Sequence, residues 1–276
     1  MRFWRPSSRF PYLGRVLFHD EDDHGPIDVV EEEGGSLRSL QFGSTARQST
    51  MFADRPDELT LEYTRCLMSA LVLREAPPAR ALMLGLGGGS LVKFLLRHLP
   101  GCRVEVVELR RRIVEVAQRF FALPRAHDRL QVHVTDGRRF LLEHTGEPFD
   151  LVLLDLHTGQ GMAPVVQAED FLPACRRATA DGGVFSANLW YGFDRALKDR
   201  VQGLLEASFE RVLALPVPGR SNHVAHGLPD GQLPPAGRME HLARVWQQQA
   251  GLALPELTRL LIRHNRIESS REGGEK

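Results

Sequence analysis

The stretch Leu82-Met83-Leu84-Gly85-Leu86-Gly87-Gly88-Gly89-Ser90 decides the fold. It begins with an apolar run that is typical of a buried strand, and it leads into residues 91–99, where apolar side chains recur at helical spacing. Glycines at such a junction permit a tight strand-to-helix turn and let the backbone approach a ligand. Their spacing is not the GxGxxG of nicotinamide enzymes. We therefore expect a different nucleoside site that includes Gly85, Gly87 and Gly89.

Strand-like and helix-like segments alternate around this stretch. Strands are expected at residues 81–86, 103–109, 130–134, 149–155, 183–189, 211–215 and 222–225. Helices are expected at residues 59–73, 91–99, 113–121, 171–178 and 196–209. Because strands joined through helices require crossover connections, the sheet should be mostly parallel. The sequence thus predicts a doubly wound α/β fold with a mostly parallel, seven-stranded, Rossmann-like sheet.

The flanking segments differ from this central part. Residues 14–45 contain three short strand-like runs, and the acidic run Asp20–Asp23 between two of them is expected to be a solvated turn. Acids and a proline at 54–58 predict the start of a helix. A Pro/Gly-rich linker at 229–237 precedes two amphipathic stretches, 239–249 and 255–267. We expect a β-rich region at 1–53, a nucleoside-binding domain at 54–228, and a linker with C-terminal helices at 229–276.

Three acids follow successive strands of the expected sheet. Glu108 closes the strand after the glycines, at about the 20-residue distance at which an acid accepts hydrogen bonds from ribose hydroxyls. Asp136, followed by Gly137, comes directly after the next strand and is placed to accept from an adenine amine. Asp155 ends the strand at 149–155. Ligands of open α/β sheets bind at the carboxyl ends of the strands, so all three acids should share one rim.

Composition excludes several other classes of protein. The 35 basic and 35 acidic residues give a net charge of +0, which argues against bulk binding of nucleic acid. No apolar stretch is long enough for a membrane span, and the N-terminus does not resemble a secretory signal. Three scattered cysteines without a CxxC predict neither disulfides nor a metal site, and they favour the cytoplasm. His223 and His226 are interpreted as structural, because that spacing on a strand points to opposite faces.

Several motifs together resemble those of the spermidine synthase (polyamine aminopropyltransferase) family, which has the class I S-adenosylmethionine-dependent methyltransferase fold. The resemblance extends from about residue 29 to about residue 189. It is carried by the glycine stretch and by Gln48-Ser49-Thr50, Asp57-Glu58-Leu59, Leu151–Asp155 and Ala168-Glu169-Asp170-Phe171.

The resemblance implies roles for particular residues. Gln48 would contact the donor nucleoside, Glu108 would hold the ribose, Asp136 would lie on the adenine side, and Asp155 would be the catalytic carboxylate. The donor would be S-adenosylmethionine or its decarboxylated form, used as a co-substrate without a metal. The other partner would be a small-molecule amine, with neither nucleic acid nor membrane involved. Family members commonly form homodimers, so a homodimer is expected.

The sequence also departs from the family pattern. Gly88 stands where the family has an acid, Thr158 replaces the second acid of an Asp-Ser-x-Asp loop, and Leu61-Glu62-Tyr63 replaces Tyr-His-Glu. A diamine carries two ammonium groups and requires several carboxylates, so we expect an acceptor other than putrescine. Without an acid at Gly88, the carboxylate of ordinary S-adenosylmethionine would meet less repulsion.

Three functions are compatible with the sequence. One is alkyl transfer of the aminopropyl type, in which Asp155 orients the acceptor amine and takes its proton. His157 could assist or could be an ordinary loop histidine, and Trp190 and Tyr191 could wall the acceptor pocket or pack in the core. A second function is methyl transfer on the same fold. The third is non-catalytic nucleoside binding.

Overall fold

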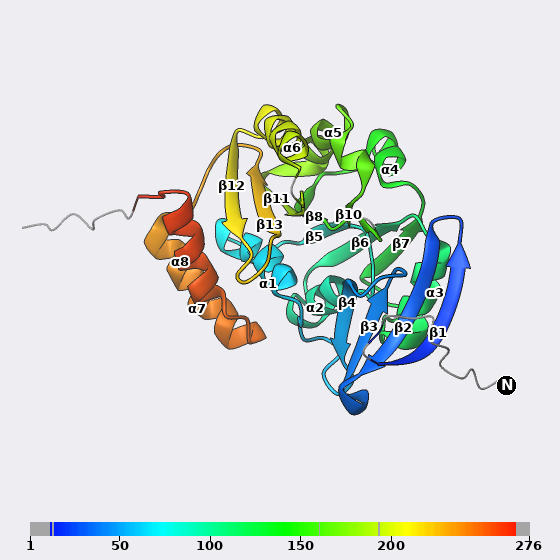
Figure 1. Cartoon of the computed structure of the whole chain (residues 1–276). Coiled ribbons are helices and arrows are strands. Elements are labelled where there is room, and N and C mark those ends of the chain that lie inside the picture. The colour runs from blue at the N-terminus through cyan, green and yellow to red at the C-terminus, as the bar shows by residue number, and fades with distance from the viewer. Residues whose placement is uncertain (1–11, 13, 160, 193, 269–276) are drawn as a thin grey trace, which may run out of the picture.

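The computed structural model describes residue 12 and residues 14–159, 161–192 and 194–268 of the chain. Figure 1 shows three parts in chain order: a small N-terminal sheet, a larger sheet with helices on both faces, and a pair of helices at the C-terminal end. The helical pair and the N-terminal sheet lie at different sides of the large sheet. None of the helices in the described ranges is long and apolar enough to cross a membrane.

The N-terminal sheet has four antiparallel strands in the order β1-β2-β3-β4. They are β1 (Arg15–Asp22), β2 (Gly25–Glu32), β3 (Leu37–Gln41) and β4 (Arg47–Phe52). The first three were expected, and β4 was not. The acidic run is not simply a solvated turn, because β1 continues to Asp22. Asp22 pairs with Arg110 at 2.8 Å and Asp20 with Arg112 at 2.6 Å, so these carboxylates link the small sheet to the start of the helix at Arg111–Phe120.

The large sheet has seven strands in the order β12-β13-β11-β8-β5-β6-β7. They are β5 (Arg80–Leu84), β6 (Arg103–Glu108), β7 (Leu130–Val134), β8 (Phe149–Leu154), β11 (Thr179–Leu189), β12 (Arg211–Pro216) and β13 (His223–Leu228). Neighbouring strands from β7 to β11 are parallel, while β13 runs antiparallel to both β11 and β12. This confirms the predicted mostly parallel, seven-stranded α/β fold.

Helices cover both faces of this sheet because its central strands are apolar on both sides. Along β5, Met83 packs in one hydrophobic cluster and Leu82 in the other, as the alternation of side chains along a strand requires. The first cluster includes side chains of α2 (Ser90–His98), α3 (Arg111–Phe120), α7 (Ala236–Ala250) and α8 (Leu254–His264). The second includes side chains of α4 (Gly137–Glu143), α5 (Phe171–Ala178) and α6 (Arg195–Ser208).

The helix expected from Asp54 starts later than predicted. Residues 54–58 form a turn, in which the Glu58 N–H donates to Arg55 O, and the helix α1 spans Glu62–Met68. It continues as the 3₁₀ helix η2 (Ser69–Leu73). The turn residues have no apolar face to bury, whereas burial starts at Leu59, which is 2% exposed. The start of this helix is therefore set by where its side chains become buried, and not by the acidic residues at 54–58.

Three smaller elements complete the structure. The hairpin of β9 (His157–Thr158) and β10 (Gly161–Met162) follows β8 directly. The 3₁₀ helix η3 (Pro164–Gln167) precedes α5. The hairpin, η3 and α4 were not predicted from the sequence. A further 3₁₀ turn, η1 (Glu33–Gly35), joins β2 to β3. The hairpin lies at the carboxyl end of the central strands, the edge at which the predicted site residues gather.

Candidate active site

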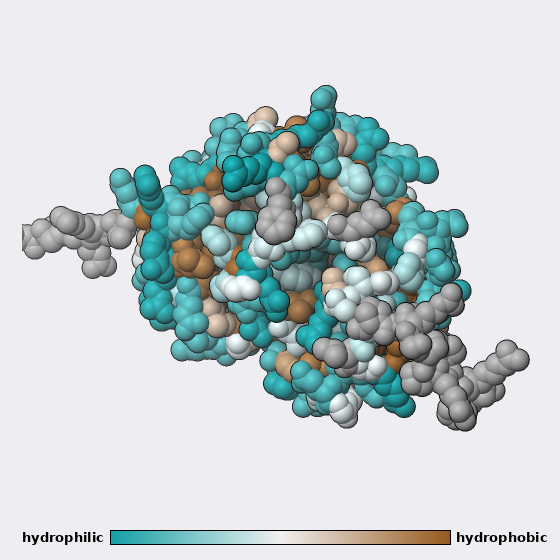
Figure 2. Space-filling view, viewed as in Figure 1, coloured by the Kyte–Doolittle hydropathy of each residue, from teal (hydrophilic) through white to brown (hydrophobic). Residues whose placement is uncertain are grey.

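A cavity with a volume of about 700 Å³ opens at the carboxyl ends of β5, β6 and β8. Side chains of the N-terminal sheet, α1, the β9–β10 hairpin and the turn before β13 form its other walls. The face shown in Figure 2 is hollowed near its centre and is otherwise mainly hydrophilic. The residues that line it include Arg47, Gln48, Ser49, Leu61, Glu62, Tyr63, Gly85, Gly87, Ser90, Glu108, Leu109, Arg110, Asp155, His157, Gly161, Asn188, Trp190, Arg220 and Asn222.

The glycine stretch brings the ends of two strands into contact. Gly85 has a φ of +91°, and a Cβ atom there would lie 2.4 Å from the backbone oxygen of Asp155. The Asp155 N–H in turn donates to Leu84 O at 3.0 Å. Gly87, with a φ of +54°, lines the cavity, whereas Gly89 is the N-cap residue of α2 in the left-handed conformation. The loop therefore requires glycine, because a side chain would be strained by the positive φ angles or would contact neighbouring atoms too closely.

Glu108 is held in a fixed orientation at the end of β6. Its carboxylate accepts hydrogen bonds from the N–H groups of Leu86 at 3.0 Å and Arg110 at 2.9 Å. Burial raises the pKa of Glu108, and these two N–H donors act in the opposite direction. The next residue, Leu109, lines the cavity and is 48% exposed. An acid beside an exposed apolar side chain suits a nucleoside, because the acid can bind the ribose and the apolar side chain can contact the base. Leu109 was not predicted from the sequence.

The other residues that were predicted to contact the donor nucleoside fall into two groups, inside and outside the cavity. Gln48, on β4, lines the cavity, so the unexpected strand carries this residue to the site. Asp136 is exposed, and its side chain caps α4 by accepting from the Arg139 N–H at 2.8 Å. Neither Asp136 nor Gly137 is among the described residues that line the cavity, and the same holds for Gly89. These three residues lie on the same edge of the sheet, but outside the cavity.

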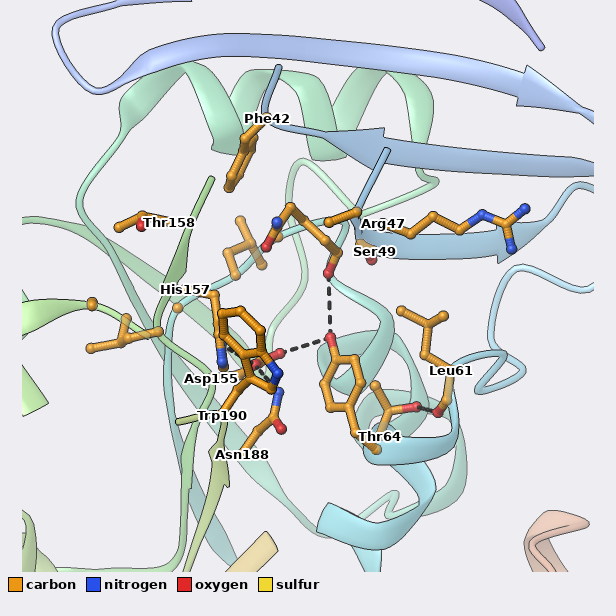
Figure 3. A pocket seen from close by; sticks show the side chains of 18 of the residues that line it. Phe42, Arg47, Ser49, Leu61, Thr64, Asp155, His157, Thr158, Asn188 and Trp190 are labelled. Carbon is orange, nitrogen blue, oxygen red and sulfur yellow. Dashed lines mark hydrogen bonds and ion pairs between the residues drawn. The ribbon is translucent and has the colours of Figure 1, made fainter. Parts of the chain in front are cut away.

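Asp155 is the centre of a hydrogen-bond network that joins three other segments of the chain. Oδ2 accepts from the Tyr63 hydroxyl at 3.0 Å, while Oδ1 accepts from Asn188 Nδ2 at 2.9 Å and from His157 Nδ1 at 3.2 Å. Figure 3 shows Asp155 beside His157, Asn188 and Trp190. Burial, together with the nearby Asp155 carboxylate, raises the pKa of Tyr63 well above its usual value, so its hydroxyl keeps the proton that it donates.

Two of these partners were not identified from the sequence. Tyr63 stands where the spermidine synthase family, which the sequence resembles, has a glutamate. This departure from the family pattern was the one sequence feature that pointed to Tyr63. Asn188 had no local signal, because only the pairing of β11 with β8 brings it to Asp155. The network continues from Asn188 Oδ1 to Asn222 Nδ2 at 3.0 Å.

The two aromatic residues after β11 have different positions. Trp190 lines the cavity, and its Nε1 donates to Ser221 Oγ at 2.9 Å. Gly161 of the β9–β10 hairpin packs against this indole, since a Cβ there would lie 2.8 Å from Trp190 Cζ3. Tyr191 packs instead against the hydrophobic cluster under α5 and α6. Of the two, Trp190 is therefore the wall residue.

Gly88 has a steric reason to be glycine. A Cβ atom there would lie 2.7 Å from Ser49 Oγ and 2.9 Å from Phe121 Cδ1, so a larger residue would require rearrangement. Ser49 Oγ and Ser90 Oγ are 3.3 Å apart and both residues line the cavity. Neutral hydroxyls therefore lie beside Gly88. In the spermidine synthase family, which the sequence resembles, the position of Gly88 is an acid.

Of the histidine pair on β13, His226 lies in the core and His223 is partly buried. His226 is buried, and its Nε2 lies 3.0 Å from the hydroxyl of Ser69. Because that hydroxyl donates to Cys66 O at 2.6 Å, Nε2 is the donor to Ser69. Across the described ranges, no group of three or more His, Cys, Asp or Glu side chains could hold a metal ion.

Comparison with known proteins identifies the family of this chain. A family model described as "Spermine/spermidine synthase domain" matches residues 61–190. The polyamine aminopropyltransferase of Neisseria meningitidis serogroup A is 32% identical over 215 residues, which are 78% of this chain and 80% of that protein. A crystal structure of spermidine synthase in complex with the transition state analogue AdoDATO has a TM-score of 0.73 at 18% identity, covering 95% of this chain and 94% of that chain.

Human methyltransferase-like protein 13 in complex with SAH is also similar, with a TM-score of 0.62 at 24% identity over 72% of this chain and 93% of that chain. Both structures share the fold of this chain. The chain belongs to the spermine/spermidine synthase family. It is a transferase of the spermidine synthase type and a divergent member of that family.

Proposed function

We propose that this chain binds S-adenosylmethionine or its decarboxylated form as a co-substrate and transfers an aminopropyl-type alkyl group to an amine other than putrescine. The observation that supports this most strongly is the Asp155 carboxylate, which three side chains orient beside the glycine loop and Glu108 in one cavity. Polyamine aminopropyltransferase relatives support the type of group transferred.

The donor would lie along the loop and the end of β6. Gln48, Gly85 and Gly87 would contact it through the cavity wall, while Glu108 would accept from the ribose hydroxyls. Leu109 offers an apolar surface to the base. Gly89 would contribute by shaping the loop, and Asp136 with Gly137 would bind on the adenine side, at the exposed continuation of the same edge.

The reaction needs alignment and a proton acceptor more than covalent assistance. The acceptor amine loses a proton to Asp155, directly or through a water, and its nitrogen lone pair then attacks the carbon attached to the sulfonium. The N–C bond forms as the C–S bond breaks, and the electron pair of that bond returns to sulfur. Tyr63, Asn188 and His157 keep the carboxylate oriented, so that it does not need to reorganise during the step.

Methyl transfer from ordinary S-adenosylmethionine is the second candidate. It is favoured by the neutral Ser49–Ser90 pair and by the lack of space for an acid at Gly88, because a donor carboxylate meets no like charge from that position. The likeness in fold to human methyltransferase-like protein 13 is compatible with it.

One experiment separates these functions. The purified chain is titrated calorimetrically with each donor form, and the donor that binds is incubated with a panel of amines for mass analysis of products. Products that gain an aminopropyl group support the first proposal, and products that gain a methyl group support the second. Donor binding without turnover of any amine would favour a non-catalytic nucleoside-binding protein.

The remaining expectations belong to the same proposal. We place the chain in the cytoplasm as a homodimer that acts on a small molecule and needs neither metal nor nucleic acid. Its three cysteines are free and buried, which suits a reducing compartment. Light scattering of the purified chain tests the dimer, and fractionation of cells tests the location.

A further inference from the structure

We infer that the acceptor is a zwitterion: a small molecule with one reactive amine and a carboxylate at its other end. This rests on the proposed transfer to an amine and narrows the class of acceptor. The inference comes from the charges that the cavity presents to an acceptor bound at Asp155.

Asp155 can take only one further hydrogen bond. A carboxylate oxygen accepts about two hydrogen bonds. Oδ1 already has two donors, Asn188 Nδ2 and His157 Nδ1, while Oδ2 has one, the Tyr63 hydroxyl. One position on Oδ2 remains, which is sufficient for one N–H of a single amine. The network thus prepares a site for one nitrogen.

A second ammonium would find little negative charge in this cavity. Glu108 binds the backbone N–H groups of Leu86 and Arg110 on the donor side. Glu62, at the first turn of α1, pairs with Arg65 at 3.2 Å, which neutralises it. These two are the acids besides Asp155 among the described residues of the cavity wall. A diamine would therefore leave one charge uncompensated.

The cavity wall presents a cation instead. Arg220 lies on the turn between β12 and β13, and its exposed guanidinium makes no hydrogen bond or ion pair with any residue in the described ranges. Two other arginines of the wall are neutralised, Arg47 by Glu32 and Arg110 by Asp22.

The turn of Arg220 is tied to the reacting centre. Ser221 Oγ accepts from Trp190 Nε1, and Asn222 donates to Asn188, which donates to Asp155. These bonds hold the turn on the acceptor side of the cavity. A carboxylate that extends from an amine at Asp155 toward this turn meets a guanidinium, the side chain best suited to bind it.

The test uses three acceptors with the same four-carbon chain: 1,4-diaminobutane, butylamine and 4-aminobutanoate. Binding of each to the chain saturated with the nucleoside thioether product is measured by calorimetry, and turnover is measured with whichever donor binds. We expect 4-aminobutanoate to bind at least about tenfold more tightly than the diamine. The Arg220→Glu variant should reverse this order. The matched control is Arg211→Glu, at an exposed position on β12 outside the described cavity wall, and it should leave the order unchanged.

The outcomes separate this inference from the proposed function. Donor binding and turnover of any amine report on the proposed function, whereas the order of the three acceptors reports on the inference alone. Tighter binding of the diamine, equal binding of all three, or binding of none would overturn the zwitterion assignment. The same effect from both arginine variants would overturn the assignment of Arg220.

Discussion

The hydroxyl of Tyr63 donates a 3.0 Å hydrogen bond to Oδ2 of Asp155, across 92 positions of the sequence. Tyr63 lies on α1, and Asp155 lies just beyond the end of β8. The same hydroxyl is 3.3 Å from the backbone oxygen of Gln48 on β4. One phenol thus connects the N-terminal sheet, the first helix and the candidate catalytic carboxylate, so the orientation of Asp155 depends on how these parts pack.

Removing this hydroxyl should slow the reaction. Tyr63→Phe is expected to lower kcat roughly tenfold and to leave donor affinity unchanged, because a hydrogen bond to a charged group contributes about 1.5–3 kcal/mol. Steady-state kinetics with the best amine acceptor measure the change. Tyr191→Phe is the control, since Tyr191 is partly buried against the hydrophobic cluster under α5 and α6, outside the described cavity wall. Equal losses in both variants would contradict the role assigned to Tyr63.

Asp155→Asn should abolish turnover while donor binding remains. The amide preserves the size of the side chain but cannot take a proton from the acceptor. Product formation by mass analysis and donor affinity by calorimetry are measured on the same preparation. Turnover at the wild-type rate would remove Asp155 from the mechanism.

Glu108→Gln should weaken donor binding about tenfold or more, because the amide loses acceptor strength toward the ribose hydroxyls and toward two backbone N–H groups. Glu105→Gln is the matched control. Glu105 lies on the same strand but pairs with Arg80 and His133 at 3.1 and 3.0 Å. Calorimetric titration of the donor compares the two variants. A control that loses as much affinity would show that the effect is a general weakening of β6.

Gly85→Ala should destabilise the chain by at least about 2 kcal/mol and should abolish donor binding. The new methyl group would lie 2.4 Å from Asp155 O at a residue whose φ is +91°, so the ends of β5 and β8 would have to separate. Gly101→Ala is the control, because a Cβ there has no neighbour within 4 Å. Thermal unfolding measures stability. Equal melting temperatures for the two variants would contradict the packing described here.

Acid should destabilise the fold through His226. Burial lowers the pKa of this histidine from 6.5 to about 3. The unfolded chain therefore binds more protons than the folded chain between these values, and the free energy of unfolding falls as the pH falls through this window. His226→Gln should make the melting temperature less dependent on pH between 7 and 5. The same substitution at exposed His241 is the control, and a wild-type slope in His226→Gln would contradict the prediction.

Much of the large sheet was predictable because its signals are local. Residues 130–134 and 171–178 form the predicted strand and helix at the predicted bounds, since apolar periodicity alone specifies them. The glycine stretch and the acids Glu108 and Asp155 were found for the same reason. They stand at strand ends, and parallel strands bring their carboxyl ends to one edge.

The errors share a different cause. β4 lacks strong alternation and forms because β3 offers a pairing edge, so Gln48 was found only through family resemblance. Residues 54–58 carry a helix start signal, yet they contribute no side chain to either hydrophobic cluster of the described residues. Asp20 and Asp22 have the composition of a turn but lie in a strand because β1 pairs with β2 as far as Asp22 and Gly25, and Arg112 and Arg110 pair with the two carboxylates.

The sequence by itself determined the α/β class, the glycine loop and the rim on which the acids lie, because strand order along the chain and residue type at strand ends specify these features. Only the tertiary structure decided what surrounds Asp155 and Gly88. Tyr63 and Asn188 reach Asp155 from segments distant in sequence, and Ser49 fills the space beside Gly88. Such contacts depend on how separate elements pack, and hydrophobic patterning along one segment carries no information about its partner on another.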